Sequence, residues 1–189
     1  DIRNMGGLRK YMPVTWLTSL LGSLALIGTP LFAGFYSKDS IIEAVHASAL
    51  PGSGFAYFAV VAGVFVTAFY SFRMYFLVFH GKERFHHKPF PGEHDHHDEH
   101  AEHHDPHESP WVVTAPLLLL AIPSVVIGFL TIQPMLFGDL MKDSIIVNGH
   151  AHHAMEELAH EFHGATAMAL HAFGTLPFWL ALAGVAVSY

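Results

Sequence analysis

The chain contains four long stretches without a charged side chain, and this feature limits its fold more than any other. Asp, Glu, Lys and Arg are all absent from residues 11–37, 44–72, 109–138 and 162–189. A helix needs about 20 apolar residues to cross the hydrocarbon core of a bilayer, and each stretch is longer than that. Only 13% of the residues are charged, about half the usual share in a soluble domain. The pattern predicts an all-α membrane protein, a polytopic bundle of transmembrane helices.

Four spans are expected, and the first of them is broken by a proline. It covers about residues 12–48 and is interrupted at Gly28-Thr29-Pro30, because proline removes a backbone donor and clashes with the preceding turn. The other spans are expected at about 55–79, 111–132 and 163–189. Pro116 and Pro123 are expected to bend the third span.

The second span carries a stripe of small residues that predicts a close helix contact. Ala59, Gly63, Thr67 and Ser71 recur at every fourth position. Such residues let helix backbones approach one another in lipid, so we expect another helix to pack on this face.

Basic residues predict the orientation of the spans. Three lie before the first span and three after the second, and with four alternating spans both groups are on one side. The opposite side has only Lys142. The positive-inside rule therefore places segments 1–11 and 80–108 in the cytoplasm. The six residues of the larger group are Arg3, Arg9, Lys10, Lys82, Arg84 and Lys88.

Composition also excludes several functions. The net charge of −7 argues against a nucleic-acid partner, which requires clustered Lys and Arg. The chain has no cysteine, so it cannot form a disulfide or ligate an iron–sulfur cluster through cysteine. Any redox chemistry is therefore expected on other subunits.

Lys38 is the residue that best indicates chemistry, because it follows Pro30 by eight residues and the chain has little length in which to leave the membrane. A lysine at bilayer depth costs several kcal/mol unless it is paired, hydrated or neutral. Discontinuous helices also cluster at the ion sites of transporters. Asp39 and Glu43 share one helical face, about 100° from Lys38. Lys38 could face a buried polar axis, with the two acids toward the exit, or it could reach water at the outer interface.

Arg73 is a candidate for electrostatic support. Arginine keeps its proton at physiological pH, so it cannot shuttle protons. It lies about six residues from the predicted cytoplasmic end of its span. Its side chain could extend to the membrane surface, or it could contact a neighbouring subunit or a lipid.

Histidines gather in two polar segments. The tract from His94 to His107 contains seven of them, without fixed ligand spacing, and we expect it to bind metals only adventitiously. In the second segment, Glu157 and His160 match half of a di-iron carboxylate motif, and the other half is absent. His171 is roughly in line with His160, as a proton relay or as a packed histidine. No functional metal site is expected.

Three motifs resemble a known family. They are Met5-Gly-Gly-Leu-Arg-Lys10, Gly34-Phe-Tyr-Ser-Lys-Asp39 and Phe72-Arg-Met-Tyr-Phe-Leu-Val-Phe-His-Gly-Lys-Glu83. Together they resemble the antiporter-like subunit L of bacterial NADH:quinone oxidoreductase (respiratory complex I), whose mitochondrial counterpart is NADH dehydrogenase subunit 5. The similarity is carried by motifs as far as about Glu83 and continues beyond it mainly as a hydrophobic pattern.

The resemblance implies a proton-translocating subunit of the membrane arm, in the inner membrane of a bacterium. Lys38 would belong to the terminal proton path, with Asp39 beside it and Glu43 and Arg73 in support. The partners would be other membrane-arm subunits, lipid and protons. NADH, FMN, iron–sulfur clusters and quinone would be bound elsewhere. Residues 1–189 would form part of one antiporter-like domain, and we expect the chain to be an internal piece of a longer protein.

Three alternatives remain open at this stage. The A-type component of a multi-subunit Na+/H+ antiporter, or a membrane-hydrogenase homologue, would share the broken-helix design. A histidine-rich metal transporter would require His and Asp ligands within the membrane, yet the second and third spans contain neither. A membrane metalloprotease would require His-Glu-x-x-His, which is absent, since His160-Glu161 is followed by Phe162-His163.

Overall fold

The computed structural model describes residues 1–85, 106–141, 143–145 and 153–189. These residues form helices and connecting segments and contain no strand, which confirms the expected all-α membrane fold. The histidine-rich residues 94–105 lie outside the described residues. The longer elements are α1 Pro13–Ile27, α2 Ala33–His46, α3 Ser53–Phe79, α4 Trp111–Ile132, η4 Gln133–Phe137, α5 His153–Glu161, α6 Ala165–His171, η5 Ala172–Gly174 and α7 Leu176–Ser188.

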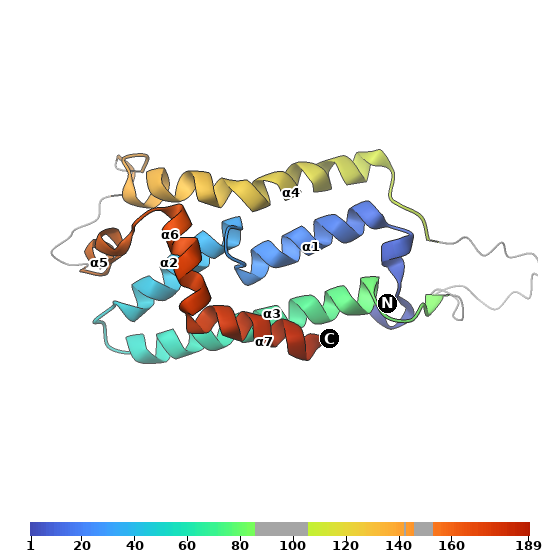
Figure 1. Cartoon of the computed structure of the whole chain (residues 1–189), viewed down its shortest axis with the longest axis horizontal. Coiled ribbons are helices and arrows are strands. Elements are labelled where there is room, and N and C mark those ends of the chain that lie inside the picture. The colour runs from blue at the N-terminus through green and yellow to red at the C-terminus, as the bar shows by residue number, and fades with distance from the viewer. Residues whose placement is uncertain (86–105, 142, 146–152) are drawn as a thin grey trace, which may run out of the picture.

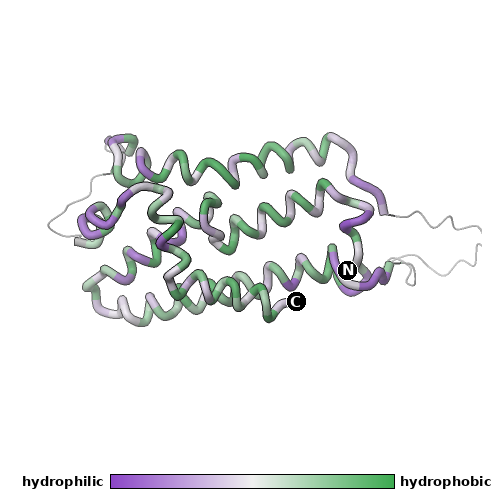
Figure 2. The backbone as a smooth tube through the Cα atoms, viewed as in Figure 1, coloured by the Kyte–Doolittle hydropathy of each residue, from purple (hydrophilic) through white to green (hydrophobic). Residues whose placement is uncertain are grey.

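The broken first span forms the centre of the bundle. In Figure 1, α1 and α2 follow one another along the same direction, and both contact α3 and α4. The 15 residues of α1 extend about 22 Å at 1.5 Å per residue, too short for a hydrocarbon core of about 30 Å. Helix α7 packs along α3. Figure 2 shows apolar residues along the helices and polar residues gathered toward the two ends of the bundle.

Two helices among the described residues are long and apolar enough to cross a membrane, namely α3 and the continuous Trp111–Phe137. Helix α4 runs through Pro116 and Pro123 without interruption. The fourth expected span is instead two helices, because the segments Ala165–Gly174 and Leu176–Ser188 meet at 65°. Pro177 accounts for the division, since proline is favoured in the first turn of a helix and ends a preceding one.

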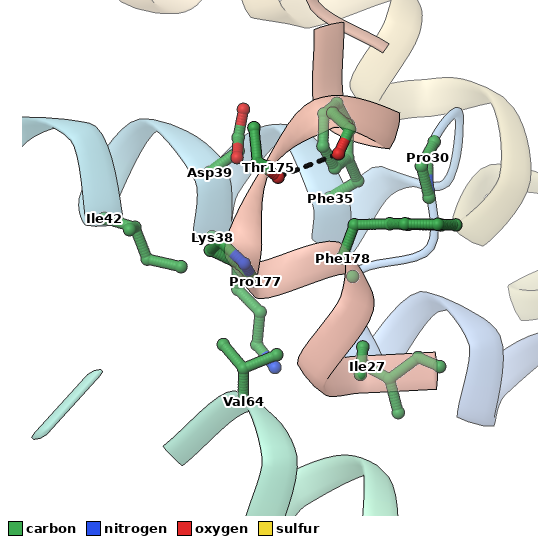
Figure 3. Close-up of a pocket in the computed structure, with 13 residues that line it drawn as sticks. Ile27, Pro30, Phe35, Lys38, Asp39, Ile42, Val64, Thr175, Pro177 and Phe178 are labelled. Atoms are coloured by element: carbon green, nitrogen blue, oxygen red, sulfur yellow. Dashed lines mark hydrogen bonds between the residues drawn. The ribbon is translucent and has the colours of Figure 1, made fainter. Parts of the chain in front are cut away.

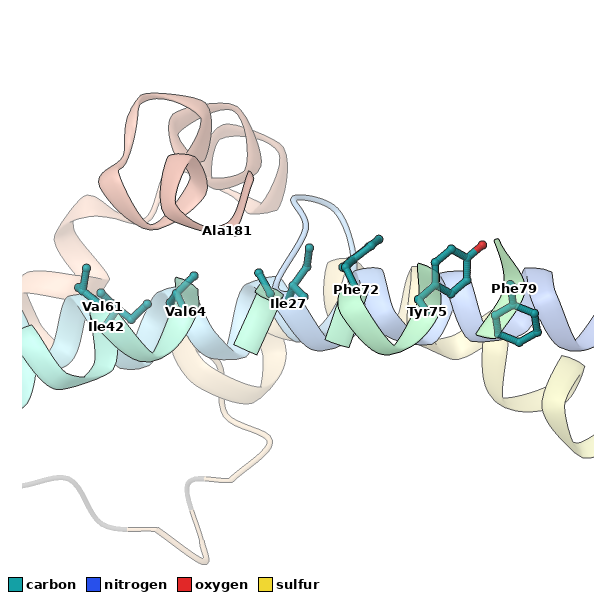
Figure 4. Packing of buried hydrophobic residues seen from close by; sticks show 9 residues of the cluster. Ile27, Ile42, Val61, Val64, Phe72, Tyr75, Phe79 and Ala181 are labelled. Carbon is teal, nitrogen blue, oxygen red and sulfur yellow. The ribbon is translucent and has the colours of Figure 1, made fainter. Parts of the chain in front are cut away.

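The close contact on α3 lies on a different face from the predicted stripe. Of the four small residues, only Ser71 is buried, and a Cβ added at Gly63 would meet no atom within 4 Å. Larger side chains form the buried row that Figure 4 shows along α3, which includes Val61, Val64, Phe72, Tyr75 and Phe79. The small residues that matter are Ala68, which is fully buried, and Gly184 on α7.

Gly184 provides a test of this contact. An added Cβ would lie 2.6 Å from the carbonyl oxygen of Phe65 and 2.8 Å from the Cβ of Ala68. We expect Gly184→Ala to destabilise the bundle by about 1–3 kcal/mol, the usual cost of overpacking. Equilibrium unfolding in mixed micelles measures the loss. Gly63→Ala is the matched control on α3, and equal destabilisation by both variants would contradict the assignment.

The first and third sequence motifs meet at one end of the bundle. Gly6 has φ +141°, and an added Cβ would lie 2.1 Å from the carbonyl oxygen of Lys82, so no larger residue fits there. The ammonium of Lys10 lies 3.1 Å from a carboxylate oxygen of Glu83. The basic residues before α1 and those after α3 are therefore at the same end, as the predicted orientation requires (Figure 1).

Glu108 caps the start of α1 from the segment that precedes α4. Its carboxylate accepts hydrogen bonds from the Val14 amide at 2.7 Å, the Thr15 amide at 3.3 Å and the Thr15 hydroxyl at 2.6 Å. These amides have no partner within the helix itself. Burial alone would raise the pKa of Glu108, but hydrogen bonds from Thr15, Val14 and Ser109 hold its pKa below the ordinary value.

This cap predicts an acid-sensitive helix start. A carboxyl whose pKa is lowered by folding contributes stability above its unfolded pKa, and the contribution is lost as the pH falls through the lowered, folded pKa. We expect the amide protection of Val14 and Thr15 against hydrogen exchange to fall over that acidic range. Glu108→Ala should remove the pH dependence at a cost of about 1 kcal/mol, typical of a lost cap. An unchanged protection profile in the variant would contradict the cap.

Candidate functional site

The site begins at the break between α1 and α2. Helix α1 ends at Gly28, which has φ 80°, a conformation that glycine adopts without a steric penalty. Leu31 has φ 76° and is the one non-glycine residue with positive φ in the described part of the chain. Such backbone strain costs about 1–2 kcal/mol and is concentrated at functional sites. The break predicted from Gly28-Thr29-Pro30 is confirmed.

Lys38 lies over this break. It is half-buried on the second turn of α2, and its Cδ would be 3.3 Å from a Cβ added at Gly28. In Figure 3 its side chain extends toward Val64 of α3. Neither of the two ion pairs formed by the described residues involves Lys38.

A small cavity surrounds the Lys38 side chain. Its volume of about 20 Å³ is enough for one water molecule. The lining comes from α1, the break, α2, α3, η5 and α7. The residues are Ile27, Gly28, Pro30, Phe35, Lys38, Asp39, Ile42, Val64, Ala172, Thr175, Pro177, Phe178 and Ala181.

Asp39 lines the same cavity but its side chain points another way. Figure 3 shows its carboxyl group directed away from the Lys38 side chain, on the side of the α6–η5 segment. The residue is only 7% exposed, and its Oδ2 has no hydrogen-bond partner among the described residues. A buried carboxylate without partners is costly, so this oxygen is suited to bind a proton or a water molecule. The predicted separation of Lys38 from Asp39 around the helix agrees with this arrangement.

A second helix break borders the cavity, and the sequence analysis did not identify it. Ala172 and Thr175 come from the connection between α6 and α7, and Pro177 follows at the start of α7. The Thr175 hydroxyl donates a hydrogen bond of 2.8 Å to the carbonyl of Ala172, which holds the turn. Gly174 and Pro177 within an apolar run were the available signal.

Glu43 lies one turn beyond Asp39 and lines a second, larger cavity of about 520 Å³. Glu161, His163 and His171 line the same cavity. His171 interacts electrostatically with both Asp39 and Glu43. The structure therefore adds His171 to the acids that were expected to face the exit.

The remaining candidates lie away from this site. Arg73 is exposed on α3, nine residues and about 14 Å along the helix from Val64. Glu157 and His160 are exposed on α5. No group of three or more His, Asp or Glu residues in the described ranges is arranged to hold a metal ion.

The fold and the site define a class before any comparison is made. A lysine and a buried aspartate where two discontinuous membrane helices meet are typical of polytopic ion-translocating proteins, whose ion sites form at helix breaks. The sequence comparisons then identify the family within this class. The chain belongs to the family of subunit L of NADH:quinone oxidoreductase. The profile of the family described as NADH:quinone oxidoreductase/Mrp antiporter, TM, matches residues 1–69, which include the break, Lys38, Asp39 and Glu43.

Individual relatives extend the similarity along the chain. The chain is 60% identical to NADH-quinone oxidoreductase subunit L of Neisseria meningitidis serogroup A, over 98% of this chain and 28% of the relative. It is 37% identical to subunit L of Mycobacterium tuberculosis, over 100% of this chain and 25% of the relative. It is 38% identical to NADH-ubiquinone oxidoreductase chain 5 of Phytophthora infestans, over 78% of this chain and 21% of the relative.

These comparisons confirm the resemblance to subunit L that the three motifs predicted. They also extend it, since the matches to the two bacterial proteins continue past Glu83 to nearly the whole chain. The chain spans about a quarter of the length of these curated relatives, between 21% and 28%.

Proposed function

We propose that this chain is a proton-translocating segment of the membrane arm of an NADH:quinone oxidoreductase. Lys38 is the group that carries the proton, and Asp39 is the next acceptor. The chain supplies no redox centre. Electron transfer to quinone on other subunits changes the electrostatic environment of Lys38, and the chain converts that change into proton movement.

The observation that carries the proposal is the position of Lys38. Its amine is half-buried at a helix break, has no ion pair among the described residues, and shares a water-sized cavity with the buried Asp39. A charged amine in such a place is close in free energy to its neutral form, because burial opposes the charge. A modest change in the local field therefore suffices to load or release its proton.

Orientation gives this proton movement a direction. Segments 1–11 and 80–108 are assigned to the cytoplasm of a bacterial inner membrane, so Lys38 lies in the outer half of its span. Glu43 supports the path electrostatically on the outer side of Asp39. Arg73, exposed on α3, is assigned to contacts with a neighbouring membrane-arm subunit or a lipid.

The proposal is tested by proton pumping in the full-length parent complex with Lys38 replaced. Coupled pumping should be lost while the complex assembles and its redox centres remain reducible. Wild-type pumping in an assembled Lys38→Ala complex would contradict the proposal.

A second candidate is cation/proton exchange, because the matched family also includes Mrp antiporters. The two functions differ in sodium dependence. Proton movement that requires Na+ and proceeds without NADH oxidation would favour the exchanger.

A further inference from the structure

We propose that His171 is the last proton-transfer group on the outer side of this path, accepting the proton from Asp39 and releasing it into the larger cavity. The inference rests on the proposed function and deepens it, since it assigns the exit of the same path. It comes from the relation between the two cavities.

The two cavities are separated by the same two short elements. On α2, Asp39 lines the small cavity and Glu43, one turn later, lines the large one. On the facing segment, Ala172 lines the small cavity and His171, the residue before it, lines the large one. A proton that crosses from one cavity to the other therefore passes between α2 and the α6–η5 junction.

Asp39 is oriented for this transfer. It is buried, its Oδ2 has no hydrogen-bond partner among the described residues, and its carboxyl group lies on the side of α6 (Figure 3). The transfer breaks the O–H bond of the protonated Asp39 carboxyl and forms an N–H bond on the His171 imidazole. Release breaks that N–H bond and transfers the proton to water in the large cavity.

His171 differs from Asp39 in its access to solvent. Its side chain is exposed, and the cavity it lines has about 520 Å³, which accommodates many water molecules. The ionisable groups that face this cavity are Glu43 from α2, Glu161 from the end of α5 and His163 from the following link. Their carboxylates favour the protonated imidazole and attract protons to the outlet.

The test compares two side chains of equal shape at position 171 in the full-length parent complex. Glutamine cannot carry a proton and glutamate can. We expect H171Q to slow proton release by about 100-fold, the lower end of what a positioned acid–base group contributes, and H171E to retain most of the rate. His160→Gln is the matched control, because His160 is exposed on α5 and lines neither cavity.

The outcomes separate this inference from the proposed function. If Lys38→Ala stops pumping and H171Q pumps like wild type, the role of His171 is overturned and that of Lys38 stands. If Lys38→Ala pumps normally, the proposed function itself fails. Equal loss in H171Q and H171E, with complete assembly, would make His171 a packing residue and overturn the inference. If H171Q does not assemble, Glu43→Gln replaces it, and wild-type release by that variant would overturn the exit.

Discussion

Replacing Lys38 by alanine is expected to reduce proton pumping through this subunit by about 100-fold or more, within the range that a positioned proton-transfer group contributes. The substitution removes the titratable amine from the cavity at the helix break and leaves Asp39 without a proton donor. The backbone is expected to tolerate the change, because the lysine stem packs over Gly28 and alanine only shortens it. Acidification driven by NADH oxidation in sealed membrane vesicles measures the effect.

Two further lysine variants sharpen this experiment. Lys38→Arg keeps the positive charge but holds its proton at physiological pH, so we expect pumping to be lost in this variant as well. Lys82→Ala removes an exposed lysine at the other end of the bundle and should pump normally. Normal pumping in the arginine variant would show that Lys38 acts through its charge alone, contrary to the proposed proton transfer.

The largest structural effect is expected from Gly34→Ala. A Cβ at this position would lie 1.8 Å from the carbonyl oxygen of Ala25, and a backbone atom at the end of α1 cannot move aside without moving the break. We expect a loss of about 3 kcal/mol or more, at or above the top of the usual range for overpacking. The parent protein should then fail to accumulate in the membrane, as measured by immunoblotting of membrane fractions.

Gly22→Ala is the matched control for this variant. Gly22 is inside α1, and a Cβ added there would meet no atom within 4 Å. Alanine is favoured over glycine in a helix interior by about 1 kcal/mol, so the control should accumulate at least as well as wild type. If both variants accumulate normally, the close approach of α2 to the end of α1 is wrong.

Much of the architecture could be predicted from the sequence, because membrane spans follow from local composition. The second and third spans agree closely with Ser53–Phe79 and Trp111–Ile132. The break after Ile27 was predictable too, since glycine and proline act on the backbone where they occur. Lys38 was identified for a similar reason, because the cost of a charge in lipid depends on its depth.

The parts that could not be predicted depend on contacts between distant segments. The buried face of α3 is set by α7, which follows it by about a hundred residues, and small residues on the sequence of α3 alone indicated the wrong side. The second break near Pro177 was missed because the apolar run around it continues without a charge. His171 could not be placed opposite Asp39 until that break was known.

The way the segment 86–105 is attached has a consequence for how such proteins diverge. On one side Glu83 is held by Lys10, and on the other Glu108 binds Val14 and Thr15, so both stems are fastened to the entrance of the same helix. Mutations or insertions between the stems then do not transmit a displacement to the proton path. Evolution is free to rewrite that histidine-rich stretch, even to lengthen it, while the machinery beneath keeps its dimensions.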